Sequence, residues 1–334
     1  MSIQPALADT RPSGIVPDRT EPEEFCPVDL DGLVDDTEID FDLYLPAEAG
    51  RFVYFRSKDL EFTSRHRQRL LDNSVRTLYI RTAERQQYLQ YLEHHLDHVL
   101  LNPEVKQAKK ATLLYSVSQT VMQETLDQPR SQTIVPRTRK LAARTVDFVL
   151  RNDRALGQLA RLMSTDYYTY THSINVCVFG VTLARQSGMN TEEIKEYALG
   201  AMLHDIGKAD VPKDLLTKTG PLTPDELAAI REHVILGERI LREHHSLSEI
   251  AMIPVAQHHE KLDGTGYPRQ ISGDDFHVFG RITAIADVFD AMTSKRTYQR
   301  AYTPFETLKL MREDLKPKFD QTLLEQFIRL LRVK

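Results

Sequence analysis

The fold is decided by an apolar helical stretch that ends in Leu203-His204-Asp205-Ile206-Gly207-Lys208. One apolar face precedes it at helical spacing, formed by Ile194, Tyr197, Ala198, Ala201 and Met202. Consecutive helical residues point about 100° apart, so His204 and Asp205 can serve one metal cluster mainly where the helix ends. The dipeptide alone is equally compatible with a helix C-terminus that carries a hydrogen-bonded histidine.

A second polar cluster follows another apolar segment. It reads Gln257-His258-His259-Glu260-Lys261-Leu262-Asp263-Gly264-Thr265-Gly266-Tyr267-Pro268. The glycines permit turns and close backbone approach that larger residues block. A polar turn after a helix would explain these glycines, but not a histidine pair in register with the helix end. The cluster therefore indicates ligands next to a binding loop.

Three more candidate ligands, His172, His233 and Asp287, adjoin apolar helix faces. A single histidine in such a place is more often a hydrogen-bonded core residue. A carboxylate beside a core face is unfavourable unless it is paired or coordinated. A single binuclear metal site explains the whole set of candidates better than five separate core histidines do. The set consists of His172, His204, Asp205, His233, His258, His259 and Asp287.

The order of these residues closely resembles the HD-GYP family, a branch of the HD-domain phosphohydrolases. The resemblance covers roughly residues 138–334, and it extends to the stretches 286–293 and Arg296-Thr297-Tyr298. It implies a phosphodiesterase that hydrolyses cyclic di-GMP to linear pGpG, with further cleavage to GMP left open. Residues 1–137 carry no such resemblance.

The resemblance implies two divalent cations. His172, His204, Asp205 and Asp287 would hold one, and His233, His258 and His259 the other, with Asp205 bridging both. Family members with a third metal carry a glutamate where this chain has Tyr168, so we predict two. Imidazole and carboxylate ligands suit iron or manganese, with nickel and zinc as alternatives. Such a pair lowers the pKa of a bridging water, giving a hydroxide for attack on phosphorus.

The resemblance also implies how the substrate is held. Asp205 and Lys208 would be the catalytic residues, with Lys208 stabilising the phosphate or protonating the leaving oxygen. Gln299 stands where many relatives carry a basic residue. The expected substrate contacts are Lys208, Gly266, Tyr267, Pro268, Asp290, Arg296 and Arg300.

The patterns predict a mainly α protein with a C-terminal all-helical HD-GYP bundle and a small N-terminal α+β domain. Helix starts are marked by capping boxes at 223–226 and 303–306. Residues 52–55 and 77–80 are rich in β-formers and predict strands. The expected divisions are an acidic disordered tail (1–40), a regulatory α+β domain (41–101), a connecting helix and linker (102–137) and the phosphodiesterase domain (138–334).

Composition limits the partners. With a net charge of −5 the chain is a poor candidate for binding a nucleic-acid polymer. Two distant cysteines imply no disulfide framework, and we expect a cytoplasmic protein without a membrane span. Beyond cyclic di-GMP, the expected partners are a second copy through the N-terminal helices and a protein docked at the Gly-Tyr-Pro loop.

Two other functions remain open at this stage. One is an HD phosphohydrolase for another cyclic dinucleotide, which a substrate panel would separate. The other is a catalytically weak cyclic di-GMP receptor that docks a protein partner. All seven candidate ligands and Lys208 are present, which favours turnover over binding alone.

Overall fold

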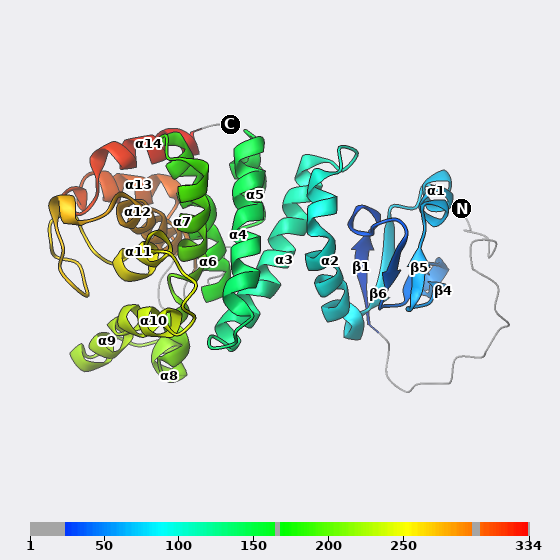
Figure 1. Cartoon of the computed structure of the whole chain (residues 1–334), viewed down its shortest axis with the longest axis horizontal. Coiled ribbons are helices and arrows are strands. Elements are labelled where there is room, and N and C mark those ends of the chain that lie inside the picture. The colour runs from blue at the N-terminus through cyan, green and yellow to red at the C-terminus, as the bar shows by residue number, and fades with distance from the viewer. Residues whose placement is uncertain (1–23, 164–167, 296–300, 333–334) are drawn as a thin grey trace. The chain divides into compact units, whose positions relative to one another are not determined.

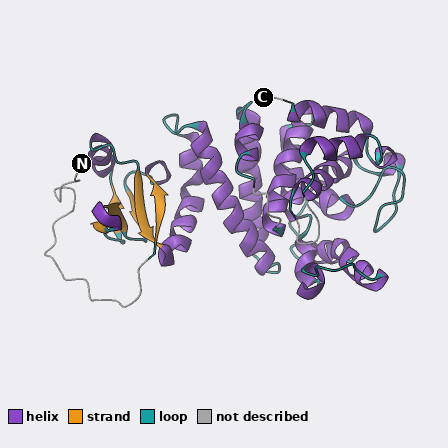
Figure 2. Ribbon diagram, turned by 180° about the vertical axis from the view of Figure 1, so that it is seen from behind, coloured by secondary structure: helices purple, strands orange, loops and turns teal. Residues whose placement is uncertain are grey.

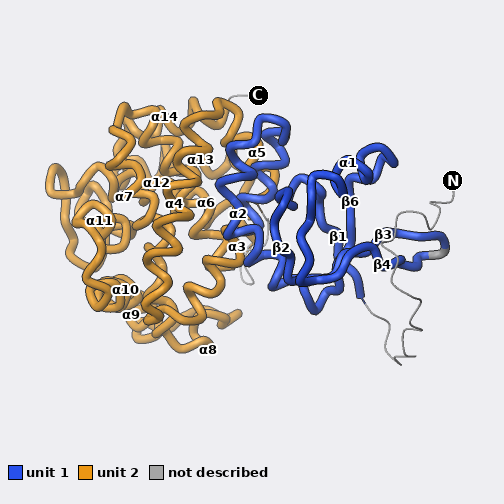
Figure 3. The backbone as a smooth tube through the Cα atoms, turned by 45° about the vertical axis from the view of Figure 1, so that its right-hand side comes forward, with its two compact units in different colours: residues 1–117 blue, residues 118–334 orange. Residues whose placement is uncertain are grey.

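The computed structural model describes residues 24–163, 168–295 and 301–332. The protein is mainly α-helical, as the sequence predicts (Figure 2). It divides into two compact units, residues 1–117 and 118–334, with the boundary inside the helix α3 (Gln107–Asp127) (Figure 3). Within the described ranges, no helix is both long and apolar enough to cross a membrane.

The first unit is built on a four-stranded antiparallel sheet with the strand order β1-β6-β3-β4. Its inward side chains are apolar, among them Leu78 and Ile80, which are fully buried. Phe25 pairs with Arg81 in the β1–β6 register. The elements are β1 (Phe25–Asp29), β2 (Thr37–Ile39), β3 (Leu43–Pro46), β4 (Phe52–Arg56), β5 (Leu60–Phe62), α1 (Ser64–Asp72), β6 (Thr77–Arg81) and α2 (Arg85–Leu101).

The expectation of a disordered tail up to residue 40 is wrong for its described part. Residues 25–29 form an edge strand that pairs with β6, and residues 37–39 pair with β5. The reason is that Val28, Leu30 and Ile39 are each only 1–2% exposed, so this acidic segment still buries enough apolar surface to fold. Residues 1–23 of the expected tail lie outside the described residues. The strands predicted at 52–55 and 77–80 are confirmed.

The second unit is all-helical, and its central helices pack around α7 (Figure 1). Helix α7 contacts α4, α6 and α11, while α6 also packs on α12. Both predicted capping boxes are confirmed, at Thr223 and Thr303. The helices are α4 (Ile134–Arg151), α5 (Ala155–Ala160), α6 (Thr169–Gln186), α7 (Thr191–Leu203), α8 (Lys213–Leu216), α9 (Pro224–Arg231), α10 (His233–Arg242), α11 (Glu249–Gln257), α12 (Val278–Thr293), α13 (Pro304–Arg312) and α14 (Gln321–Leu331).

Two glycines let backbone segments of this unit approach one another closely. A Cβ on Gly200 of α7 would lie 2.1 Å from the Ala251 carbonyl oxygen of α11. A Cβ on Gly207, in the 3₁₀ turn Ile206–Asp210, would lie 1.9 Å from the His233 carbonyl oxygen. Because backbone atoms cannot move aside cheaply, only glycine fits at these crossings. The crossings bring the ends of α7, α10 and α11 together.

Candidate metal centre

Five of the seven predicted ligands lie at helix ends. His204 caps α7 and Asp205 begins the following 3₁₀ turn, whereas His233 is the first residue of α10. His258 caps α11, and His259 follows it directly. The other two project from helix interiors, His172 from the first turns of α6 and Asp287 from α12. Five helices of the second unit thus supply one centre.

The structure brings all seven side chains together in two groups. One contains His172, His204 and Asp287, and the other contains Asp205, His233, His258 and His259. Within each group, the ligand atoms lie within 4.8 Å of one another. Metal–ligand bonds of about 2.0–2.2 Å place neighbouring ligand atoms at such separations. Each group can therefore surround one cation.

The Asp205 carboxylate lies between the two groups. Its Oδ2 atom is 3.4 Å from His204 Nε2 and 3.8 Å from His172 Nε2. Its Oδ1 atom is 3.4 Å from His233 Nε2 and 3.8 Å from His258 Nε2. One oxygen thus faces each half of the centre, which is the arrangement that a bridging carboxylate requires.

Hydrogen bonds on the outer side of the imidazoles fix which nitrogen faces inward. The Nδ1 atoms of His204 and His233 lie 2.7 Å from the carbonyl oxygens of Ala201 and Ile230. His258 Nδ1 is 2.9 Å from the Pro254 carbonyl oxygen. A carbonyl oxygen can only accept, so in each case Nδ1 donates and Nε2 keeps its lone pair towards the centre. Such outer bonds typically orient metal-binding histidines.

Several inward atoms have no partner that explains their burial. His204 Nε2 and Asp205 Oδ1 are buried, and neither has a hydrogen-bond partner among the described residues. His233 Nε2 and His258 Nε2 lie 3.1 Å apart, although both present lone pairs. Leaving a buried polar atom unpaired costs about 1–3 kcal/mol. Bound cations would satisfy these atoms, so the residues present fit a metal centre.

The protonation states also favour cation binding. Burial alone would raise the pKa of Asp205, but the charges of Lys208 and His204 hold it well below its usual range. Burial lowers the pKa of His258, and neighbouring histidines lower it further. Burial likewise lowers the pKa of His233, although Asp205 opposes the shift. The centre therefore holds an ionised Asp205 and neutral imidazoles at His233 and His258, the forms that bind metals.

These shifts predict how the stability of the metal-free protein depends on pH. The unfolded chain protonates its histidines near pH 6.5, whereas the folded state keeps His233 and His258 neutral to lower pH. Stability is thus present above this pH and is lost as the pH falls below it, by about 1.4 kcal/mol per pH unit for each histidine. Urea unfolding between pH 7 and 5 measures this slope. The slope should be smaller in His258→Gln, and an equal slope in that variant would contradict the assignment.

Asp290 is a correction to the expected substrate contacts. Its side chain is buried, and Oδ2 accepts a hydrogen bond from His172 Nδ1 at 2.7 Å. The other oxygen, Oδ1, accepts from Asn175 Nδ2 at 2.9 Å. Asp290 therefore orients His172 from behind, since both of its oxygens are already engaged. Asn175 was not predicted, although it lies one helical turn after His172 on the same face.

The Gly-Tyr-Pro loop packs against the centre at His259. The Tyr267 ring stacks on His259, with ring centroids 4.7 Å apart. Gly266 is buried, and a Cβ there would lie 2.4 Å from Glu260 Cα, so only glycine fits this close approach. Pro268 is half-buried beside the ring. The predicted contacts Arg296 and Arg300 lie outside the described residues.

Lys208 reaches into the centre from the 3₁₀ turn that follows α7. Its Nζ atom donates to Asp205 Oδ2. Its side chain is 18% exposed, whereas the Asp205 side chain is 1% exposed. Lys208 therefore connects the buried carboxylate with the solvent-facing side of the centre.

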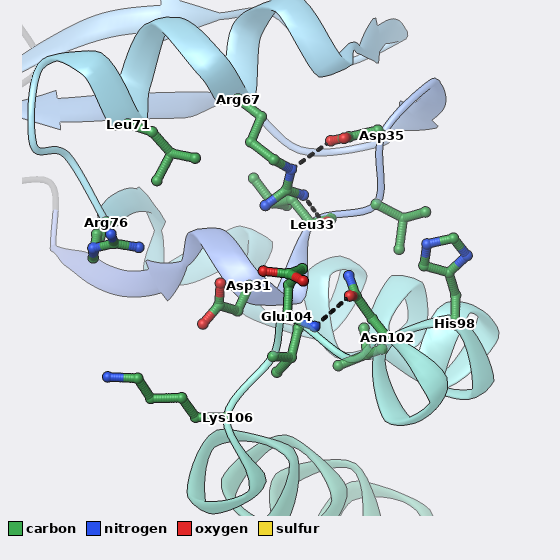
Figure 4. A pocket seen from close by; sticks show the side chains of 13 residues that line it. Asp31, Leu33, Asp35, Arg67, Leu71, Arg76, His98, Asn102, Glu104 and Lys106 are labelled. Atoms are coloured by element: carbon green, nitrogen blue, oxygen red, sulfur yellow. Dashed lines mark hydrogen bonds and ion pairs between the residues drawn. The ribbon is translucent and has the colours of Figure 1, made fainter.

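The first unit contains a separate cavity of about 670 Å³. Arg67 lines the cavity and donates hydrogen bonds to Asp35 and to the Leu33 carbonyl oxygen (Figure 4). The Asn102 side chain accepts a hydrogen bond from the Glu104 amide. None of the seven candidate ligands lines it. His98 lies at its edge, and neither metal-capable group among the described residues includes it. The cavity is thus distinct from the metal centre.

Comparison with known proteins places this centre in a family. The family model of the HD domain matches residues 138–323, and the chain belongs to the HD domain family. An HDG"Y"P protein of Bdellovibrio bacteriovorus has a similar fold, with a TM-score of 0.66 at 21% identity over 92% of this chain and 100% of that chain.

Curated relatives confirm the resemblance to the HD-GYP branch. A cyclic di-GMP phosphodiesterase of Pseudomonas aeruginosa is 37% identical over 181 residues, 54% of this chain and 44% of the relative. A cyclic di-GMP phosphodiesterase of Thermotoga maritima is 35% identical over 167 residues, which are 49% of this chain and 45% of the relative. A 3'3'-cGAMP-specific phosphodiesterase of Vibrio cholerae is 38% identical over 168 residues, which are 48% of this chain and 31% of the relative. The matched segments span less than half of each relative.

Proposed function

We propose that the protein is a metal-dependent phosphodiesterase that hydrolyses cyclic di-GMP to linear pGpG. The observation that carries the proposal is the division of the Asp205 carboxylate between two groups of inward-facing ligands. The relatives named cyclic di-GMP phosphodiesterases support the choice of substrate. Iron or manganese is the proposed metal, because the ligands are imidazoles and carboxylates.

The residues of the chain would divide the work of hydrolysis. One cation would be held by His172, His204 and Asp287. The other would be held by His233, His258 and His259, and Asp205 would be a ligand of both. Two bound cations supply an activated water for attack on phosphorus and neutralise phosphate charge. Lys208 Nζ would hydrogen-bond a non-bridging phosphate oxygen. Water adds to phosphorus as the bond to the 3′ oxygen breaks, and that oxygen gains a proton.

Turnover by anaerobically purified protein tests this proposal. We expect the protein to convert cyclic di-GMP to pGpG, which chromatography and mass spectrometry would detect. A chelator should stop the reaction. Adding iron or manganese back should restore it. Binding of cyclic di-GMP without turnover in the presence of either metal would contradict the phosphodiesterase and would favour the receptor function.

A substrate panel separates cyclic di-GMP from the second candidate substrate. The relatives named 3'3'-cGAMP-specific phosphodiesterases, at 35–38% identity, make 3'3'-cGAMP that candidate. We expect a higher kcat/KM for cyclic di-GMP than for 3'3'-cGAMP. The reverse order would move the proposal to the other cyclic dinucleotide while leaving the metal centre as described.

A further inference from the structure

Among the described residues of the metal centre, His259 and Lys208 are the most exposed. The side chains of His172, His204 and Asp205 are 0–1% exposed, and those of His233 and His258 are fully buried. His259 is 25% exposed and Lys208 is 18% exposed. A substrate that reaches the cations must therefore pass His259 and Lys208, next to the half-buried Tyr267.

An arginine that the sequence did not single out lies on this accessible side. The guanidinium carbon of Arg231 is 5.0 Å from the centroid of the Tyr267 ring, which itself stacks on His259. Arg231 is the last residue of α9, two residues before His233. Its backbone position is therefore tied to the metal centre. Contact with the ring holds a guanidinium by its face and leaves its N–H edges available for an anion.

Arg231 is exposed, and among the residues that the structure describes its side chain contacts the Tyr267 ring and forms no ion pair with an acid. By contrast, the nearby Arg269 binds Glu238 through two hydrogen bonds of 2.7 and 2.9 Å. Arg231 therefore places a positive charge beside Tyr267 that an anion could neutralise.

A cyclic dinucleotide has two phosphodiesters, and only one of them can occupy the metal centre during cleavage. We propose that Arg231 forms a second phosphate subsite beside Tyr267 that holds the phosphodiester not being cleaved. Bidentate binding of phosphate suits the planar guanidinium. The subsite rests on the proposed function, and it extends that function by assigning recognition of the dinucleotide to residues outside the metal centre.

Two substrates measured on one variant test the subsite. Cyclic di-GMP has a second phosphate, whereas bis(p-nitrophenyl) phosphate has a single phosphodiester and can use only the metal centre. For Arg231→Gln we expect the KM for cyclic di-GMP to rise about tenfold, as the loss of a charged hydrogen bond implies, with kcat little changed. The kcat/KM for bis(p-nitrophenyl) phosphate should stay the same. Arg231→Lys, which keeps the charge but not the planar fork, should give an intermediate KM.

Arg312→Gln, at an exposed arginine that ends α13, is the matched control and should leave both substrates unaffected. An unchanged KM for cyclic di-GMP in Arg231→Gln would overturn the subsite. Equal losses on both substrates would also overturn it, because they would show that Arg231 only supports Tyr267 and the metal centre. Failure of the proposed function is recognised separately, by wild-type protein that cleaves bis(p-nitrophenyl) phosphate but not cyclic di-GMP.

Discussion

Asp205→Ala is expected to empty both metal positions and to lower phosphodiesterase activity by at least about 10²–10³-fold. The reason is geometric, because Oδ1 faces His233 and His258 while Oδ2 faces His172 and His204. Removal of this one carboxylate takes a ligand from both groups. The metal content per chain, measured by plasma mass spectrometry after anaerobic purification, and the rate of pGpG formation check the prediction.

Three further variants make the Asp205 result specific. Asp314→Ala changes an exposed acid and should leave metal content and activity unaltered. Asp205→Asn preserves the size of the side chain, so it separates loss of ligation from a packing defect. His233→Ala removes a ligand from one group only and should keep one cation. Retention of a full cation per chain in Asp205→Ala would refute the bridging role.

Gly207→Ala should give the second large effect, on stability. The added Cβ would lie 1.9 Å from the His233 carbonyl oxygen and 2.4 Å from the Gly237 amide nitrogen, both backbone atoms of α10. Either the 3₁₀ turn or α10 must move. We expect a loss of about 3 kcal/mol in the free energy of unfolding, or a fall in Tm of roughly 6–12 °C. Bound metal should also decrease, because His233 moves with α10.

Gly220→Ala provides the matched control for Gly207→Ala. No atom lies within 4 Å of a Cβ added at Gly220, so the same substitution should leave the Tm nearly unchanged. Differential scanning calorimetry of both variants, each with its metal content measured, gives the comparison. Equal melting temperatures for the two variants would show that the crossing between Gly207 and α10 is looser than described.

Two pairs of ligands could be predicted because they stand where apolar helical stretches end. His204 with Asp205, and His258 with His259, follow apolar helices and precede breaks, so their positions could be predicted without coordinates. The role of Asp290 could also have been inferred, since it lies one turn after Asp287 on the same face of α12. The structure shows that this face points one carboxylate at the centre and the next at the back of His172.

Two features could not be predicted, for different physical reasons. The strands of residues 25–39 were hidden by their acidic composition, although the few apolar side chains there are almost fully buried. The contact of Arg231 with Tyr267 has no local signal at all. It arises because the junction of α9 and α10 and the Gly-Tyr-Pro loop meet through packing of the second unit.

If metal binds at the ends of α7, α10 and α11, it would also affect the lifetime of the protein. The ends of helices unfold locally before their middles do. Here bound metal ions would hold those ends in place, and the ions must come from the surroundings. Binding energy at such a clamp adds directly to folding energy. Scarcity of the ion would therefore expose these termini to proteases, so the cellular abundance of the protein would follow the supply of its metal.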